Sequence, residues 1–168
     1  ISKQTHARVL RSDVLRKTIY GTDAKDKSLE FGQDKYSSEA TDHTYRALVQ
    51  CAQSELIHSR SVIVDASFTA IDYRAVFFEF ARKAKLPVAL IWCELDRSTA
   101  LTRLKARTEL GTDVSDGRAE LYDKQLDHTQ LPTPDERIPL LEIDTSSSVS
   151  TLAEKALDFL CASVNQTS

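Results

Sequence analysis

Four short apolar runs along the chain have the composition of β-strands that are buried on both faces. They are rich in β-branched residues and little interrupted by polar ones, whereas a strand with one solvated face would alternate between apolar and polar positions. The runs cover residues Ala7–Leu10, Ser61–Ala66, Val88–Leu95 and Leu140–Asp144. Strands of this kind are typical of parallel sheets that helices cover on both faces.

Between these runs the apolar residues recur at helical spacing. Tyr45, Leu48 and Ala52, for example, would lie on one face of a helix. The helical stretches are residues Ser38–Ser59, Ala70–Lys85, Arg97–Arg107 and Val149–Val164. Strand and helix therefore alternate, which predicts an α/β fold of three layers with a mostly parallel sheet and right-handed crossovers. In such sheets ligands bind at the carboxyl ends of the strands, so the polar residues after each strand are the candidates for a site.

Two polar segments show little periodicity and are predicted to be surface loops. They are Gly21–Ser37 and Thr108–Gly117, and both carry charged residues. The second segment has two interpretations, a lid over a ligand or a solvated connection between two helices.

Length and charge limit the function classes. The 168 residues weigh 18.8 kDa, enough for one core and too little for two ordinary domains, so we expect a single domain over residues 1–168. A formal net charge of -3 leaves no excess of basic residues for duplex nucleic acid. No run reaches the roughly 18 to 20 apolar residues that span a bilayer, so no membrane partner is expected. The chain begins without the apolar core of a signal peptide, which favours a cytoplasmic location.

Asp65 ends the second apolar run, in the string SVIVDASF. A carboxylate at the end of a buried strand is costly unless it is paired, hydrogen-bonded or close to a metal. An aspartate at this position suits the Mg²⁺ site of proteins that transfer phosphate. The alternative is a helix N-cap, a role that Ser67 and Thr69 are also suited to fill.

A second polar group, RSDVLRK, follows the first apolar run directly. If a helix starts at Ser12, Asp13 and Arg16 lie three residues apart on one face of it. Together with Arg11 they place two cations and a carboxylate where a phosphate and an acceptor hydroxyl would meet. The alternative is an ordinary helix start, with Ser12 as the N-cap and Asp13 in the first turn.

A third group, TRLKARTELGTDVSDG, carries two arginines four residues apart. Arg103 and Arg107 would share one face of a helix, and the guanidinium group is suited to forked phosphate contacts. The loop that follows adds Asp113, Ser115 and Asp116. Surface ion pairs are the alternative for such arginines, and the spacing does not decide between the two.

The order of these motifs along the chain resembles a family of small kinases. The strand ending in RSDVLRK is followed by Tyr36, Thr44–Tyr45, SVIVDASF with Arg74, LTRLKAR, DVSD, Gln125 and LLEIDT. From Ala7 to Thr145 the chain is similar to the P-loop kinase-like domain of bifunctional aminoglycoside phosphotransferase/ATP-binding proteins. More broadly, it is similar to zeta toxins, chloramphenicol phosphotransferase and the kinase domain of polynucleotide kinase.

The resemblance implies an ATP-dependent phosphotransferase that acts on a hydroxyl of a small molecule, with ATP and Mg²⁺ as cofactors. It implies that Asp13 aligns or deprotonates that hydroxyl, with Arg16 close by. It also implies that Asp65 supports Mg²⁺, that Arg103 or Arg107 reaches over the phosphates, and that a loop borders the adenine. The implied nucleotide contacts are Arg107, Asp144, Thr145 and Ser146. The implied acceptor contacts are Arg11, Asp13, Arg16, Tyr45 and Arg74.

One departure from the family is large. No GxxxxGK followed by Ser or Thr occurs in the sequence, and the four glycines are isolated. In the family this phosphate loop lies just before the region matching Ile1–His6, after the first and central strand. The chain also lacks methionine. We therefore expect that the first strand and the P-loop are missing from this N-terminus, and that an upstream segment of the same protein is a partner.

Other readings of the sequence remain open at this point. A degenerate relative that has lost nucleotide binding would also lack the phosphate loop. A domain of the same fold with a non-catalytic, nucleotide-binding or regulatory role is a second function, and an ATP hydrolase, in which water replaces the acceptor, is a third. Fold alone does not separate these functions.

Overall fold

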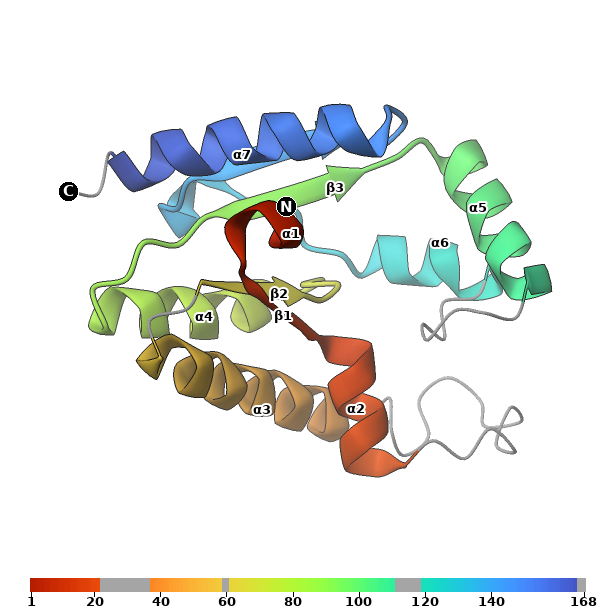
Figure 1. The fold of residues 1–168 in the computed structure, drawn as a ribbon. Helices are drawn as coiled ribbons and strands as arrows, with labels where there is room; N and C mark the ends of the chain where they lie inside the picture. The colour runs from red at the N-terminus through yellow and green to blue at the C-terminus, as the bar shows by residue number, and fades with distance from the viewer. Residues whose placement is uncertain (22–36, 59–60, 111–118, 166–168) are drawn as a thin grey trace. The chain divides into compact units, whose positions relative to one another are not determined.

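The computed structural model describes residues 1–21, 37–58, 61–110 and 119–165. They form two compact units, which we describe separately. The N-terminal unit comprises Ser2–Phe68, and the C-terminal unit comprises Thr69–Ser168 with Ile1. Each unit holds one pair of parallel strands and its own helices (Figure 1). That the chain is a single domain stays a prediction.

In the N-terminal unit the strands β1 (Arg8–Arg11) and β2 (Val62–Asp65) pair in parallel, with Arg8 opposite Val62 and Arg11 opposite Asp65. The short helix α1 (Ser2–Thr5) precedes β1, and the helix α2 (Ser12–Tyr20) begins directly after β1. The 20-residue α3 (Ser38–Ile57) packs against both strands and against α2.

The apolar face of α3 builds the core of this unit. Tyr45, Leu48 and Ala52 are all buried, as their spacing predicts. Burying a side chain such as that of Leu48 stabilises the fold by roughly 1.5–3 kcal/mol. The helix starts where Ser37 acts as the N-cap, because its hydroxyl accepts a hydrogen bond from the Ala40 amide at 3.1 Å.

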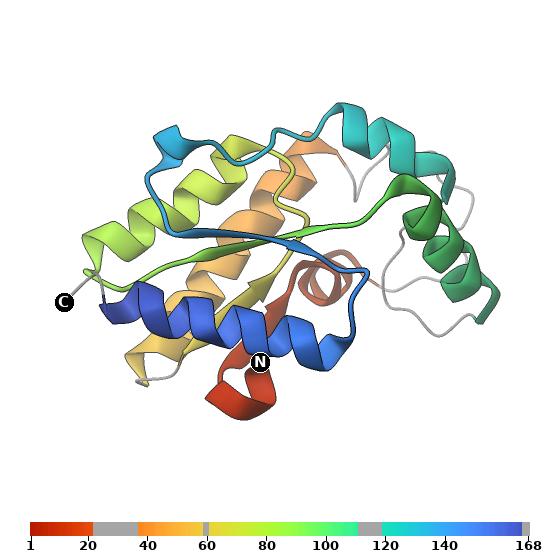
Figure 2. The same cartoon turned by 90° about the horizontal axis from the view of Figure 1, so that it is seen from above.

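In the C-terminal unit β3 (Leu90–Glu94) and β4 (Leu140–Asp144) pair in parallel, and α7 (Val149–Asn165) runs along this pair (Figure 2). The remaining elements are α4 (Ile71–Lys83), α5 (Arg97–Leu110), α6 (Ala119–Asp127) and the 3-10 helix Pro134–Glu136. Within the described ranges, no helix combines the length and the apolar composition that a bilayer crossing requires.

The structure confirms the alternation of strands and helices that the sequence predicts. It differs at Thr108–Leu110, which belong to α5 and not to a loop. The rest of the two predicted loops, residues 22–36 and 111–117, lies outside the described residues. The strands are also less buried than expected for the interior of a sheet, since Val9 is 39% exposed in a sheet of two strands.

A buried ion pair holds the C-terminal unit together. The side chains of Arg74 and Glu136 are 0% and 7% exposed. Arg74 donates to both carboxylate oxygens of Glu136, at 2.8 and 2.7 Å, and to the carbonyl of Gln130 at 2.8 Å. Its guanidinium also lies 5.8 Å from the centre of the Trp92 ring. One side chain thus joins α4, β3 and the segment before β4.

We predict that Glu136→Gln destabilises the protein by about 3–5 kcal/mol, because it leaves the buried Arg74 charge without its partner. Denaturant unfolding measures the loss. The matched control is Asp123→Asn, which breaks the exposed pair of Asp123 with Arg97 and should leave the unfolding free energy almost unchanged. Equal losses in the two variants would contradict the role of the buried pair.

The same pair predicts a pH dependence. The hydrogen bonds from Arg74 hold the pKa of Glu136 below its ordinary value of 4.5, and burial opposes this only in part. Because the folded pKa is the lower one, the stabilisation is complete above pH 4.5 and is lost as the pH falls through the folded pKa. Glu136→Gln should lack this acid-induced loss.

Candidate functional site

Two predicted site residues meet at the carboxyl ends of β1 and β2. Arg11 and Asp65 are the last residues of their strands and lie opposite each other in the register. Arg11 Nε donates to Asp65 Oδ2 at 3.2 Å, with the side chains 40% and 61% exposed. Because an exposed ion pair contributes little to stability, either side chain can exchange its partner for a charged ligand at low cost.

The helix-cap interpretation of Asp65 is wrong. The next helix, α4, begins at Ile71. Its N-cap residue is Ala70, whose side chain makes no capping hydrogen bond. The Ile71 amide instead donates to Gln130 Oε1 at 2.8 Å. The carboxylate after β2 is therefore not used to start this helix.

Asp13 and Arg16 occupy the first turns of α2. The helix begins at Ser12 with Arg11 as its N-cap residue, so the interpretation of Ser12 as the cap is wrong. Arg16 Nη1 donates to Thr41 Oγ1 on α3 at 3.4 Å. Across the described part of the chain, the Asp13 carboxylate has neither a hydrogen bond nor an ion pair. It is thus available to a ligand.

Tyr45 connects α3 to the segment that follows β2. Its side chain is buried, and its hydroxyl accepts a hydrogen bond from the Phe68 amide at 3.0 Å. Burial raises the pKa of Tyr45, while hydrogen bonds from Ser67 and Phe68 and the charge of Arg16 lower it in part, and the charge of Asp13 adds to the rise. The phenol is therefore close enough to α2 for its pKa to respond to the charges of Asp13 and Arg16.

The N-terminal unit thus gathers five of the predicted residues near the carboxyl ends of its strands. They are Arg11, Asp13, Arg16, Tyr45 and Asp65. Sequence reasoning missed Thr41 and Phe68. The spacing of Thr41 and Tyr45, four residues apart and so on one helix face, is the signal that would have found the first. No local signal marks Phe68.

In the C-terminal unit, the loop after β4 is held by hydrogen bonds. The amide and the hydroxyl of Thr145 both donate to the carbonyl of Glu94, each at 2.8 Å. Arg103 Nη1 on α5 donates to the carbonyl of Thr145 at 3.0 Å. Asp144 Oδ1 accepts from the Ser146 amide at 2.8 Å. The structure therefore brings Arg103 to the predicted loop, while Arg107 lies one turn further along α5 and is exposed.

Arg74, the remaining predicted acceptor contact, lies in the buried ion pair described above. Its donors are used by Glu136 and by the carbonyls of Gln130 and Leu131. This geometry favours a structural role for Arg74 and does not support a contact with an acceptor. The polar residues Asp113, Ser115 and Asp116 lie outside the described residues.

The exposed carboxylate of Asp65 is a group that Mg²⁺ commonly binds. Among the residues that the structure describes, no three His, Cys, Asp or Glu side chains gather as a metal cage would require. Mg²⁺ is commonly bound through one or two carboxylates and completes its shell with water and phosphate oxygens. An exposed carboxylate at a strand end fits that pattern.

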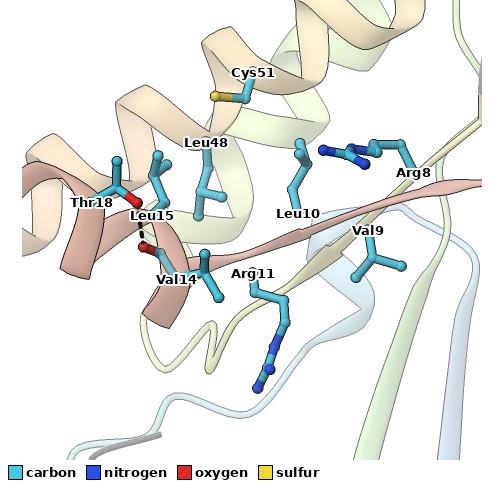
Figure 3. A pocket seen from close by; sticks show the side chains of 9 residues that line it. All are labelled: Arg8, Val9, Leu10, Arg11, Val14, Leu15, Thr18, Leu48 and Cys51. Carbon is cyan, nitrogen blue, oxygen red and sulfur yellow. Dashed lines mark hydrogen bonds between the residues drawn. The ribbon is translucent and has the colours of Figure 1, made fainter. Parts of the chain in front are cut away.

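A small cavity of about 160 Å³ lies in the same unit, between β1, α2 and α3. It is lined mainly by apolar side chains, among them Leu10, Leu15 and Leu48 (Figure 3). Figure 3 shows Leu10 and Arg11 pointing to opposite sides of β1, as successive strand residues do. The cavity is therefore mainly a gap beside the apolar side of β1, although Arg11 is also among the residues that line it.

Residues 1–132 match a protein family described as AAA domain, which is more than half of the chain. The chain belongs to this family. Its fold also matches a gluconokinase from Sinorhizobium meliloti 1021, with a TM-score of 0.69 and 16% identity over 98% of this chain and 83% of that one. A candidate kinase from Chloroflexus aurantiacus j-10-fl gives a TM-score of 0.66 and 16% identity over 96% of this chain and 86% of that one. No curated protein matches the chain.

At this low identity the two structures establish the fold alone. It is the α/β fold of P-loop kinases, which confirms the predicted α/β class and the predicted kinase-like domain. That the first strand and the P-loop are missing from the N-terminus stays a prediction. The roles of the individual site residues stay predictions.

We predict that Arg103→Ala loosens the loop after β4, because the variant removes the charged donor to the Thr145 carbonyl. Hydrogen exchange of the segment Asp144–Ser148 should become several-fold faster. Lys105→Ala is the matched control, since it removes another exposed cation from α5. Unchanged exchange in Arg103→Ala would show that the loop does not depend on this arginine.

Proposed function

We propose that this chain is an ATP-dependent phosphotransferase domain that moves the γ-phosphoryl group of ATP to a hydroxyl of a small molecule. The observation that carries the proposal is the arrangement at the carboxyl ends of β1 and β2. There an available carboxylate, Asp13, follows a strand whose last residue pairs with Asp65. Membership of the AAA domain family and the kinase-type fold support this function over other uses of the same residues.

In this proposal Asp13 and Arg16 act on the acceptor. The carboxylate of Asp13 orients the hydroxyl and takes its proton as the oxygen attacks phosphorus, and the bond from the γ-phosphorus to the bridging oxygen of ADP breaks. Arg16, fixed by Thr41, compensates negative charge near the transferred group. Most of the rate enhancement in such transfers comes from positioning and charge neutralisation.

Asp65 is the proposed Mg²⁺ ligand, and Arg11 is its counter-charge in the protein alone. Mg²⁺, if bound there, would neutralise negative charge on the phosphate groups. A cation on Asp65 would compete with Arg11 for the carboxylate, so Arg11 would become available to a phosphate oxygen or to the acceptor. The weak, exposed pair is suited to this exchange.

In the C-terminal unit we propose different roles for the two arginines of α5. Arg103 supports the loop Asp144–Ser146, the proposed nucleotide contact, through its hydrogen bond to Thr145. Arg107 is exposed and is the proposed contact to the phosphates. The observed bond of Arg103 to the Thr145 carbonyl supports the first role, and the exposed position of Arg107 on the same helix supports the second.

A non-catalytic nucleotide-binding or regulatory domain is the second candidate function. It uses the same fold, and fold alone does not separate a domain that transfers the phosphoryl group from one that only binds the nucleotide. The two candidates differ in whether bound ATP is consumed.

We predict that Asp13→Asn in the full-length protein lowers kcat for phosphotransfer by about 10² to 10⁴-fold and leaves nucleotide affinity unchanged, because its partner is the acceptor hydroxyl. Product formation gives kcat, and calorimetric titration gives the affinity.

The matched control for this prediction is Asp158→Asn, which removes an exposed carboxylate from α7 and should leave both quantities unchanged. A parallel loss of nucleotide affinity in Asp13→Asn would assign Asp13 to the nucleotide and not to the acceptor. ATP that binds to the unmodified protein without being consumed would favour the second candidate.

A further inference from the structure

One face of α3 reaches both parts of the proposed site in the N-terminal unit. Thr41 and Tyr45 lie four residues apart and so on the same face of this helix. Thr41 Oγ1 accepts a hydrogen bond from Arg16 on α2, and the Tyr45 hydroxyl accepts one from the Phe68 amide after β2. The helix α3 therefore sets the distance between Arg16 on α2 and the segment that follows Asp65.

That segment has a conformation that it does not favour on its own. Phe68 has a φ of 46°, in the left-handed region that residues other than glycine, asparagine and aspartate rarely adopt. Two contacts with Tyr45 hold it there. One is the hydrogen bond from the Phe68 amide at 3.0 Å, and the other is the packing of the two rings, whose centres are 5.6 Å apart. The strained residue lies three positions after Asp65, so its conformation helps to set the path of the chain there.

The burial of Tyr45 argues against the acceptor contact expected from the family resemblance. Only 3% of the residue is exposed, and its hydroxyl is engaged by the protein backbone. Burial raises the pKa of the phenol, so the hydroxyl stays protonated at neutral pH and is not a general base. The contribution of Tyr45 is instead the hydrogen bond that holds the Phe68 amide in place.

We propose that Tyr45 is a positioning residue of the phosphotransfer site, whose hydroxyl fixes the segment Ala66–Phe68 and thereby the orientation of the Asp65 carboxylate. The proposal rests on the proposed function for the task of Asp65 and on the observed contacts for the role of Tyr45. Thr41 positions Arg16 in the same way, by accepting its hydrogen bond. The two residues therefore support different partners, and their variants should differ in a measurable way.

The test is Tyr45→Phe in the full-length protein, which keeps the ring and removes the hydroxyl. We expect kcat to fall about tenfold or more, since small displacements of reacting groups have large effects on rate. We also expect the Mg²⁺ concentration at half-maximal activity to rise about tenfold, with the KM for the acceptor little changed. A variant that merely loses folded protein would have a lower rate at an unchanged Mg²⁺ requirement.

Two control variants sharpen this result. Tyr20→Phe removes a hydroxyl of the same unit that is bonded to His43 Nδ1 at 2.8 Å and to the Ala40 carbonyl at 3.5 Å, both on α3, so it should change neither quantity. Thr41→Val removes the acceptor for Arg16 and should lower kcat without moving the Mg²⁺ requirement. A shift of the Mg²⁺ requirement in Thr41→Val as large as in Tyr45→Phe would overturn the assignment of separate partners.

Asp65→Asn separates failure of this proposal from failure of the proposed function. If Asp65→Asn leaves the Mg²⁺ requirement unchanged, the proposed function of Asp65 is wrong. If Asp65→Asn raises the requirement and a folded Tyr45→Phe does not, the positioning role of Tyr45 is overturned. Hydrogen exchange of the unmodified protein needs no variant, because the Phe68 amide should be protected by its bond to Tyr45, and rapid exchange there would overturn the proposal.

Discussion

The parallel pairing of β1 with β2 is the constraint on which the proposed site depends. Because the two strands end in the same row of the register, Arg11 and Asp65 lie opposite each other at one edge. The chain then enters α2 without an intervening loop, which places Asp13 in the first turn of a helix that starts at that edge. A shift of the register by one residue would turn Asp65 to the other face of the sheet and separate it from Arg11.

The helix α3 converts this pairing into a defined geometry. Its apolar face is buried in the N-terminal unit, while Thr41 and Tyr45 bond to α2 and to the segment after β2. The C-terminal unit uses its own buried anchor, the pair of Arg74 with Glu136, which fixes the segment before β4. In both units a fully or nearly buried polar side chain holds a connecting segment, and the residues proposed to meet ligands are exposed or half-exposed.

The sequence alone predicts the helices and strands well and the long-range contacts poorly. Leu140–Asp144 is a strand with the bounds that its apolar run predicts, and Asp65 ends a strand as expected. Periodicity shows which face of a helix is buried, so the core position of Tyr45 was predictable. Its partner Phe68 was not, because nothing in the string SVIVDASF indicates a left-handed residue bonded to a helix 23 residues earlier.

Arg74 is a second residue whose long-range partner the sequence does not predict. The family pattern suggests an acceptor contact, but its partner Glu136 lies 62 residues further along the chain, and only the folded structure shows that the two are buried together. One of the two interpretations of RSDVLRK makes Ser12 the N-cap of α2, whereas Arg11, still extended as part of the strand, occupies that position. Local sequence signals place residues to within about one position, and capping depends on that last position.

The fate of the γ-phosphoryl group tests the central claim most directly. The full-length protein is incubated with Mg²⁺, ATP labelled at the γ-phosphate and a panel of small alcohols, and the labelled products are separated. Transfer to a hydroxyl is the result that this account predicts, with the label in a phosphate ester of one class of alcohol. Label that appears only as inorganic phosphate, at a rate independent of every alcohol, or ATP that stays bound and intact, would contradict it.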